Sequence, residues 1–379
     1  MTTPTQETLY AMALTRVGHL SSATLLQLYQ LTGSATAIFE HRNHIEDVIP
    51  DISPRLKENL CHLDEALRRA EEELNYDQYY GIQVLTMADS DYPQRLLNCD
   101  DAPLVLYYKG SANLNAQRII NIVGTRKCTA YGQDLIRSFV QELSMACPNV
   151  LIVSGLAYGV DIHAHRHALQ CGLDTVGVLA HGLDDLYPPR HRDTAAKMLS
   201  QGGLLTEHMT CTNADKVNFV RRNRIVAGMS DACVLVESAA HGGGLITARL
   251  SREYNRDVYA FPGRIGDLYS EGCNNLIRDN GAQLITSADD MVRAMGWQND
   301  QQLYQAQQSG IERQLFPDIT PDEQIIMDAL QKQNDQQINM LSVATNMSVQ
   351  QLTALLFEME MKGIVRTLAG GSYHLIMNG

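Results

Sequence analysis

Four glycine-bearing turns follow apolar stretches in the middle of the chain. They are GTRK (124–127), SGLAYG (154–159), AHGLDDLYPPR (180–190) and HGGGLITA (241–248). Glycine lets backbone N–H groups approach an anion, and the N-terminus of a following helix adds positive potential. One such turn is common wherever strands and helices alternate, but four in one region, with arginines in or near them, favour phosphate binding.

The first turn carries two cations. Arg126 can bind a phosphate through two parallel hydrogen bonds, although an ion pair with a nearby carboxylate is the alternative. Lys127 has a weaker claim, because a surface lysine is usually only solvated. The turn contains neither G-x-G-x-x-G nor G-x-x-x-x-G-K-[ST], so it does not carry the signature of a dinucleotide or P-loop site.

A second basic cluster lies in KVNFVRRNRIVAG, at the start of an apolar helix. Arg221, Arg222 and Arg224 follow Phe219, and Lys216 precedes it by three residues. Cations that track a phosphate backbone, next to an aromatic ring on which a base can stack, are typical of single-strand binding. The alternative is that the ring belongs to the core and that the arginines form internal ion pairs; Arg222 and Arg224 fit a structural role in either case.

No catalytic or metal-binding set stands out. His163, His165 and His167 are two residues apart, a spacing that does not bring helix side chains to one metal, so we expect them to pack or to face solvent. Asp161 is a candidate cap for their helix. Neither a Ser/His/Asp set nor a distinguished pair of carboxylates can be assembled, and no metal or cofactor is expected.

Composition sets the broad class. The 379 residues suggest two or three domains, and eight cysteines without a C-x-x-C pair fit reduced cytosolic thiols. With no long apolar run and no signal-peptide pattern, we expect a cytoplasmic protein without a membrane span. The net charge of −13 argues against nucleic acid at first sight, but residues 116–286 are nearly neutral and their basic residues cluster, which leaves room for a basic groove.

Residues 116–290 alternate apolar strands with amphipathic helices, which predicts an α/β fold with a parallel sheet covered on both faces. In such sheets ligands bind beyond the carboxyl ends of the strands. The strand candidates are RIINIV, VLIVSG, TVGVLA, GLLTEH, ACVLVES, DVYAFPG and AQLIT.

The flanks divide into further segments. Residues 1–75 have helical apolar spacing around a Gly18 turn, which predicts a small bundle or a SAM/helix-hairpin-helix-like domain. Residues 76–115 are a connector to the core in which LVLYY predicts a short strand, so that the core domain spans 76–290. The polar, Gln-rich residues 291–318 are typical of a linker.

Residues 319–379 predict a winged-helix-like domain. Thr320 and Glu323 form a capping-box pattern, two more helices follow, and a hairpin is expected around Gly370–Gly371. The second helix of the helix-turn-helix is not basic, so a protein-contact or dimer-modulating role is favoured over DNA reading.

The central motifs, taken in order, resemble those of the DNA-processing protein A family, also called Smf or DprA. The resemblance covers residues 116–290, and the ordered set is far more specific than any single turn. The motifs are IVGTRKCTAYG, IVSGLAYGVDIHAHRHAL, VLAHGLDDLYPPRH, GGLLTEH, NFVRRNRIVAG, GGGLITARL and FPGRIGDLYSEGCNNLIR.

This resemblance implies an extended Rossmann-like core that binds single-stranded DNA. Family members protect incoming strands in natural transformation, load the recombinase RecA and are thought to dimerise through the core, and no catalytic activity is established as their role. By motif, Arg126 matches a phosphate-contacting arginine, whereas Lys216 and Phe219 match a lysine and a base-contacting phenylalanine. The candidate DNA contacts are Gly124, Thr125, Arg126, Lys127, Ser154, Gly155, Arg190, Lys216, Phe219, Arg221, Arg222, Arg224, Gly242, Gly243 and Gly244.

Two departures and two alternatives accompany this interpretation. Tyr158 stands where many members carry Arg, and Val220 where many carry Pro, a change expected to affect the loop that presents Phe219. The core also resembles phosphoribohydrolases with P-G-G-x-G-T-x-x-E, but His241 replaces the proline and Arg249 the catalytic glutamate, which removes the expected base. A nucleotide-sensing regulator that acts through the winged helix is the other alternative.

Overall fold

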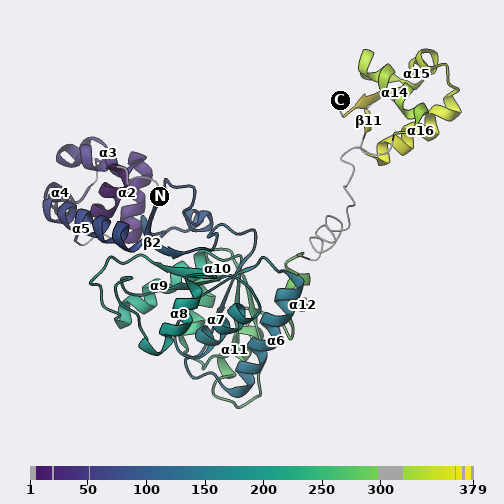
Figure 1. Cartoon of the computed structure of the whole chain (residues 1–379). Coiled ribbons are helices and arrows are strands. Elements are labelled where there is room, and N and C mark those ends of the chain that lie inside the picture. The colour runs from purple at the N-terminus through teal and green to yellow at the C-terminus, as the bar shows by residue number, and fades with distance from the viewer. Residues whose placement is uncertain are drawn as a thin grey trace. The chain divides into compact units, whose positions relative to one another are not determined.

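The computed structural model describes residues 6–18, 21–50, 52–297, 319–362, 364–368 and 372–376. The chain forms two compact units, residues 1–301 and 302–379 (Figure 1). No helix of the described residues is long and apolar enough to cross a membrane.

The predicted strands of the central region form the parallel part of a nine-stranded sheet within the described residues. In space their order is β6-β5-β4-β3-β7-β8-β9, so the chain builds outward from β3 to β6 and then returns to place β7 on the other side of β3. This reversal is that of a doubly wound, extended Rossmann-like fold, and it opens a crevice at the carboxyl ends of β3 and β7. The strands are β3 (Ile119–Val123), β4 (Leu151–Ser154), β5 (Thr175–Val178), β6 (Gly202–Thr206), β7 (Ala232–Leu235), β8 (Asp257–Ala260) and β9 (Gln283–Leu284).

Two antiparallel strands from the connector extend the predicted parallel sheet. β2 (Val105–Gly110), the strand expected from LVLYY, pairs antiparallel with β6, and β1 (Gln83–Thr86) pairs antiparallel with β2 at the edge of the sheet. β1 has only four residues and only part of it is buried, so it has too little apolar pattern to stand out in the sequence. The connector therefore extends the core sheet.

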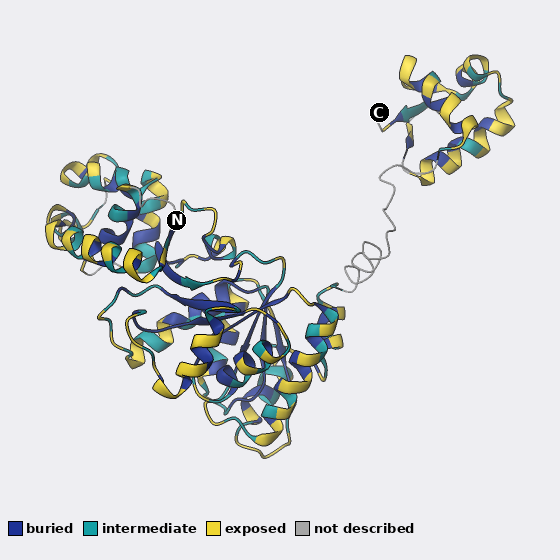
Figure 2. Ribbon diagram, in the orientation of Figure 1, coloured by how far each residue is buried: buried dark blue, intermediate teal, exposed yellow. Residues whose placement is uncertain are grey.

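Helices cover both faces of the sheet. Alternate residues of β3 point to opposite faces, with Ile119 in one apolar cluster and Ile120 in the other. Figure 2 shows the same division along the helices, whose inner sides are buried and outer sides exposed. One face carries α6 (Ala130–Ala146), α7 (Val160–Gln170) and α12 (Ala288–Ala294); the other carries α9 (Lys216–Gly228), α10 (Gly243–Glu253) and α11 (Glu271–Arg278), and α8 (Arg192–Met198) packs beside β5 and β6.

The position of α12 corrects the expected end of the core. Met291 and Val292 of this helix are buried in the same cluster as α6, so the core continues past residue 290. Residues 298–318, the rest of the expected linker, lie outside the described residues.

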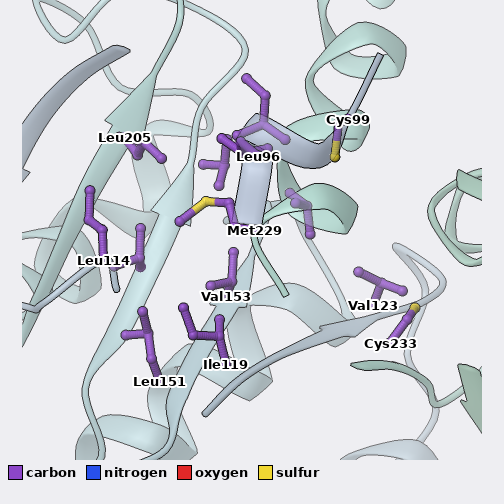
Figure 3. Close-up of a cluster of buried hydrophobic side chains, with 14 of the residues drawn as sticks. Leu96, Cys99, Leu114, Ile119, Val123, Leu151, Val153, Leu205, Met229 and Cys233 are labelled. Carbon is purple, nitrogen blue, oxygen red and sulfur yellow. The ribbon is translucent and has the colours of Figure 1, made fainter. Parts of the chain in front are cut away.

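One apolar cluster fixes the inner end of α9. Figure 3 shows Met229, which follows α9, among side chains that include Ile119 of β3 and Val153 of β4, together with Leu96. Full burial of each such side chain contributes about 1.5–3 kcal/mol. Because the core holds the C-terminal end of α9, the exposed first turn at the other end of the helix has a fixed position.

The N-terminal helices pack on the antiparallel strands. Their apolar cluster includes Val105 and Tyr107 of β2, and α5 continues to Tyr80, beyond the expected boundary at residue 75. The elements are α1 (Gln6–Leu14), α2 (Ser22–Thr32), α3 (Ala35–Glu40), η1 (Arg42–Asp47), α4 (Pro54–Cys61) and α5 (Asp64–Tyr80), with η2 (Gln94–Asn98) between β1 and β2.

The second unit is a winged helix. The Thr320–Glu323 capping box is present, and the small sheet has the order β10-β12-β11. The expected hairpin is formed by β11 and β12, and its turn at Gly370–Gly371 lies outside the described residues. The elements are α14 (Pro321–Lys332), β10 (Gln336–Gln337), α15 (Ile338–Thr345), α16 (Val349–Met361), β11 (Val365–Leu368) and β12 (Ser372–Leu375).

Candidate functional site

A hollow of about 600 Å³ lies in the crevice at the carboxyl ends of the parallel strands. All four glycine-bearing turns contribute to its lining, as the sequence predicted. Gly124 follows β3, Gly155 follows β4, Tyr187 lies after β5, and Gly244 lies after β7. The topology therefore gathers segments that are more than a hundred residues apart into one site, which we call the crest hollow.

Phe219 is the aromatic centre of the crest hollow. The guanidinium carbon of Arg126 lies 5.1 Å from the centroid of its ring, and the ring of Tyr187 lies 5.6 Å away at an angle of 56°. Lys216, one turn earlier on α9, also lines the hollow. The arrangement places two cations and two aromatic rings at one surface, where phosphates and bases of one strand can be contacted together.

A helix, not a loop, presents Phe219, which corrects the expectation attached to Val220. Helix α9 begins at Lys216, and the Asp215 carboxylate caps it by accepting a hydrogen bond of 2.7 Å from the Asn218 N–H. Proline has no N–H and is best tolerated in the first turn of a helix, whereas Val220 lets the helix extend through the aromatic residue.

Hydrogen bonds within the protein hold the first turn and the residues after it. The Thr125 N–H donates to the Glu237 carbonyl at 2.7 Å, and the buried Glu237 carboxylate accepts from the Thr129 N–H at 2.8 Å and from the Thr129 hydroxyl. A carboxylate of the chain itself thus occupies the N-terminus of α6. The Thr125 amide is therefore not free to bind an anion, whereas Gly124 and the Arg126 side chain line the crest hollow.

The second turn is closed in the same way. The Asp161 carboxylate accepts hydrogen bonds from the N–H groups of Gly155 (3.1 Å) and Ala157 (3.3 Å), and the Ser154 hydroxyl donates to the Ile122 carbonyl. Asp161 thus holds the turn before α7 in place of the expected helix cap, and Ser154 is fully buried. Burial raises the pKa of Asp161, while Arg222 and the turn amides act in the opposite direction.

The fourth turn remains open. Gly242 caps α10 without a side-chain hydrogen bond, and Gly243 and Gly244 line the crest hollow. A Cβ on Gly244 would lie 2.7 Å from Leu235 Cδ1 and 2.9 Å from Gly124 Cα, so no other residue fits there. Among the described turns of the hollow, this helix N-terminus is the one that matches the predicted amide contacts.

Arg222 and Arg224 are buried, in agreement with the structural role that the sequence allowed for them, and Arg222 also lines the crest hollow. Arg222 Nη1 donates to the Gly155 carbonyl at 2.7 Å and to the Val178 carbonyl, which joins α9 to the ends of β4 and β5. Arg224 pairs with the Glu207 carboxylate. Burial lowers the pKa of Arg222 to about 10, so it is charged at neutral pH.

The remaining predicted contacts lie outside the crest hollow. Lys127 and Arg190 are exposed, and Arg221 faces a second hollow on the other side of α9. Tyr158 packs against the ring of His191, with 5.0 Å between the ring centroids. Arg249, at the position of the catalytic glutamate of phosphoribohydrolases, is exposed and pairs with Glu253 on α10 at 3.6 Å.

The three histidines of α7 do not meet at one site: His165 is buried, whereas His163 and His167 are half-exposed, which agrees with the expectation that they pack or face solvent. His165 is fully buried with Nδ1 2.7 Å from the Thr175 hydroxyl, and burial lowers its pKa to about 3. The rings of His163 and His167 stack with their centroids 6.4 Å apart. The described residues hold no group of three His, Cys, Asp or Glu side chains that fits a metal ion.

Sequence reasoning missed Tyr187, Asn223 and the anchoring carboxylate Glu237. Tyr187 had a signal, because it is an aromatic residue inside one of the glycine-bearing turns. Asn223, one turn after Phe219 on α9, lies within the RRNR segment that was considered for its arginines alone. Glu237 follows an apolar strand and carries no local sign that it bonds to a turn more than a hundred residues earlier.

Comparison with known proteins supports the interpretation of these motifs. A family model described as DNA recombination-mediator protein A matches residues 83–296, and one described as DprA winged helix domain matches residues 312–371. Protein Smf of Synechocystis is 37% identical over 227 residues, which are 59% of this chain and 56% of that protein. DNA processing protein DprA of Streptococcus pneumoniae is 36% identical over 215 residues, which are 57% of this chain and 75% of that protein. The chain thus aligns with only about half of the Synechocystis relative.

Two solved structures share the architecture. DNA processing protein A of Streptococcus pneumoniae has a TM-score of 0.66 and 30% identity, and the match covers 78% of this chain and 98% of that one. The second, described for the single-stranded DNA binding mode of DNA processing protein A from Helicobacter pylori, has a TM-score of 0.51 and 28% identity over 56% of this chain and 95% of that one.

Proposed function

The chain belongs to the family of DNA recombination-mediator protein A, and on that premise we propose that its crest hollow binds single-stranded DNA. The observation that carries the proposal is the contact of Arg126 with the ring of Phe219, beside Lys216. A cation that contacts an aromatic platform can hold a phosphate while the adjacent base stacks on the ring. The single-stranded DNA binding described for the Helicobacter pylori relative agrees with this assignment.

The geometry favours unpaired over paired strands. Phe219 and Tyr187 offer ring faces and edges to bases, and in a duplex those base faces are covered by stacking. Arg126, Lys216 and the open N-terminus of α10 offer contacts to phosphates, which are the same in every sequence. We therefore expect strong salt dependence and little sequence preference.

The proposed biological role follows the family. The bound strand would be protected and handed to the RecA recombinase during DNA uptake and recombination in the cytoplasm, by a homodimer formed through the core. Binding, rather than catalysis, is the proposed role of the hollow, so incubation with AMP should release no adenine. If the strand is handed over from this site, Arg126→Ala should abolish any stimulation of RecA assembly on protein-coated single strands.

Fluorescence anisotropy with labelled oligo-dT and a duplex of equal length tests the binding proposal. Wild type should prefer the single strand, and Arg126→Ala should flatten the dependence of log K on log salt by about 0.7 if one phosphate contact is lost. Phe219→Ala should weaken binding by about 1–3 kcal/mol without changing that slope. Arg137→Ala is the charge-matched control, because Arg137 is exposed on α6, outside the hollow. Wild-type affinity that ignores salt, or two site variants that bind like wild type, would refute the proposal.

A further inference from the structure

Helix α9 separates the crest hollow from a second hollow of about 270 Å³, which lies between the N-terminal helices and the core. Phe219 and Asn223 line the crest hollow, whereas Asn218 and Arg221 line the second hollow. Residues three or four apart lie on one side of a helix. One side of α9 therefore faces the crest hollow, and another side faces the second hollow.

Two arginines from different segments line the second hollow. Arg221 comes from α9 and Arg16 from the segment after α1, and both side chains are exposed. Within the described ranges, neither forms an ion pair. The acidic residue of the lining, Glu207, is already neutralised by Arg224, so the hollow carries an excess of positive charge.

The rest of the lining suits phosphate oxygens. Hydroxyl donors come from Ser22 and Thr212, and Ser21 caps the N-terminus of α2, which points positive potential at the same place. The ring atom Nε2 of His208 is buried here and has no hydrogen-bond partner among the described residues. A site with two exposed arginines, hydroxyl donors and a buried imidazole nitrogen suits an oxygen-rich anion.

We propose that a single strand held in the crest hollow continues across the first turns of α9 into the second hollow, where Arg221 and Arg16 contact its phosphates. The inference rests on the proposed function of the crest hollow and adds a second phosphate-binding site to it. It also gives the N-terminal helices a part in DNA binding. A free phosphate fills a single site. A single strand carries a row of phosphates, so it can contact sites on both sides of one helix.

A length series of labelled oligo-dT tests this path, because a short strand fills one hollow and a long strand both. An oligomer of about 5 nucleotides lies near the lower end of the usual range of site sizes, and one of about 20 nucleotides exceeds that range. Arg16→Ala should weaken binding of the long oligomer about fivefold at 0.1 M salt, the effect of one phosphate contact, and leave the short one unchanged. Arg126→Ala should weaken both.

Three variants complete the design. Arg221→Ala should reproduce the length-dependent loss, Arg16→Lys should restore most of the affinity because a phosphate needs the charge, and Arg137→Ala should change neither oligomer. Arg16 and Arg221 are exposed, so the substitutions should leave the thermal unfolding midpoint in place. If Arg16→Ala and Arg221→Ala bind the long oligomer like wild type while Arg126→Ala does not, the second site is wrong and the crest hollow stands. If wild type binds neither oligomer, the proposed function itself fails.

Discussion

The crest of the core sheet and helix α16 of the winged-helix unit expose different kinds of side chain. The crest hollow presents Arg126 and Lys216 beside aromatic rings. Helix α16 contains no Lys or Arg, and Phe357 and Met361 on it are 65% and 76% exposed. The second helix of a DNA-reading helix-turn-helix lies in the major groove between two rows of phosphates, where a helix without cations gains little.

A winged-helix fold does not by itself imply that the unit binds DNA. The Glu360 carboxylate of α16 accepts hydrogen bonds from the N–H (3.0 Å) and hydroxyl (2.9 Å) of Thr367 on β11, so one of its acidic groups holds the wing. Exposed apolar side chains that lie together on a surface mark contacts with proteins, membranes or ligands. We therefore place strand binding in the core and expect protein contacts at α16.

The largest effect expected from a substitution to alanine separates interior from exposed arginines within the core. Arg222→Ala removes charge-assisted hydrogen bonds to the carbonyls of Gly155 and Val178 and leaves both buried groups unpaired, so the free energy of unfolding should fall by about 3 kcal/mol. Its neighbour Arg221 is exposed, and Arg221→Ala should leave stability unchanged. Urea unfolding followed by circular dichroism measures both. Equal losses of unfolding free energy for the two variants would contradict the division into interior and exposed arginines.

The two units should respond to pH in opposite directions. Burial and the nearby Glu73 raise the pKa of Asp77 to about 8, so the folded core holds a proton that the unfolded chain releases. Core stability should therefore fall as pH rises from about 4 to 8, by at most about 1.4 kcal/mol per pH unit. Burial alone would raise the pKa of Glu323, but the bonds from Lys362 and Thr320 outweigh it and lower the pKa.

The lowered pKa of Glu323 makes the winged-helix unit acid-sensitive. Its contribution is complete above the ordinary glutamate pKa and is lost as pH falls through the lower value of the folded state. Thermal unfolding at a series of pH values should show the two trends, with Asp77→Asn removing the first and Glu323→Gln the second. Core stability that rises with pH between 4 and 8 in wild type would overturn the assignment.

A smaller effect concerns the second ring of the crest hollow. Tyr187→Ala should weaken oligo-dT binding by about 1–2 kcal/mol, because a stacking surface is lost, and should leave the salt slope unchanged. Tyr187→Phe keeps the ring and should bind like wild type. Tyr79, exposed on α5, supplies the matched control variant Tyr79→Ala. Fluorescence of 2-aminopurine placed in the oligomer reports stacking directly, and quenching that survives Tyr187→Ala in full would remove this residue from the site.

Two lysines, one in the lining of the crest hollow and one outside it, test where the hollow ends. Lys216 lines it and Lys127 does not, although both are exposed and lie near Arg126 or Phe219 in the sequence. Lys216→Ala should flatten the salt slope by about 0.7, the value for one phosphate contact on a single strand, whereas Lys127→Ala should leave it unchanged. A salt titration of oligo-dT affinity compares them, and a flatter slope for Lys127→Ala would move the boundary of the hollow.

The sequence predicted the core well because the signal for each strand is local. Apolar runs such as IINIV and ACVL become buried strands, and the alternation with amphipathic helices fixes a doubly wound sheet. The same logic placed all four glycine-bearing turns at one edge. β1 was missed because four partly buried residues carry almost no pattern.

The candidate site was predicted less completely because it depends on long-range bonds. The sequence alone cannot show that Glu237 neutralises the turn before α6, or that Asp161 bonds to the amides before α7. Nor does it separate Arg222, which is buried, from Arg221 beside it, until the helical phase of α9 against the sheet is known. Tyr187 reaches Phe219 only through the fold.

The smallest expected effect is that of removing the winged-helix unit. Residues 1–301 form a compact unit that holds the whole crest hollow, so the chain that ends there should bind oligo-dT as tightly as the full chain under the same salt. Residues 302–379 alone should bind neither duplex nor single strand, because α16 carries no cation for a phosphate. Anisotropy with both fragments is the measurement, with circular dichroism to confirm that each is folded. Tight duplex binding by residues 302–379 would contradict this prediction, and α16 would then be a DNA-binding element in addition to the core.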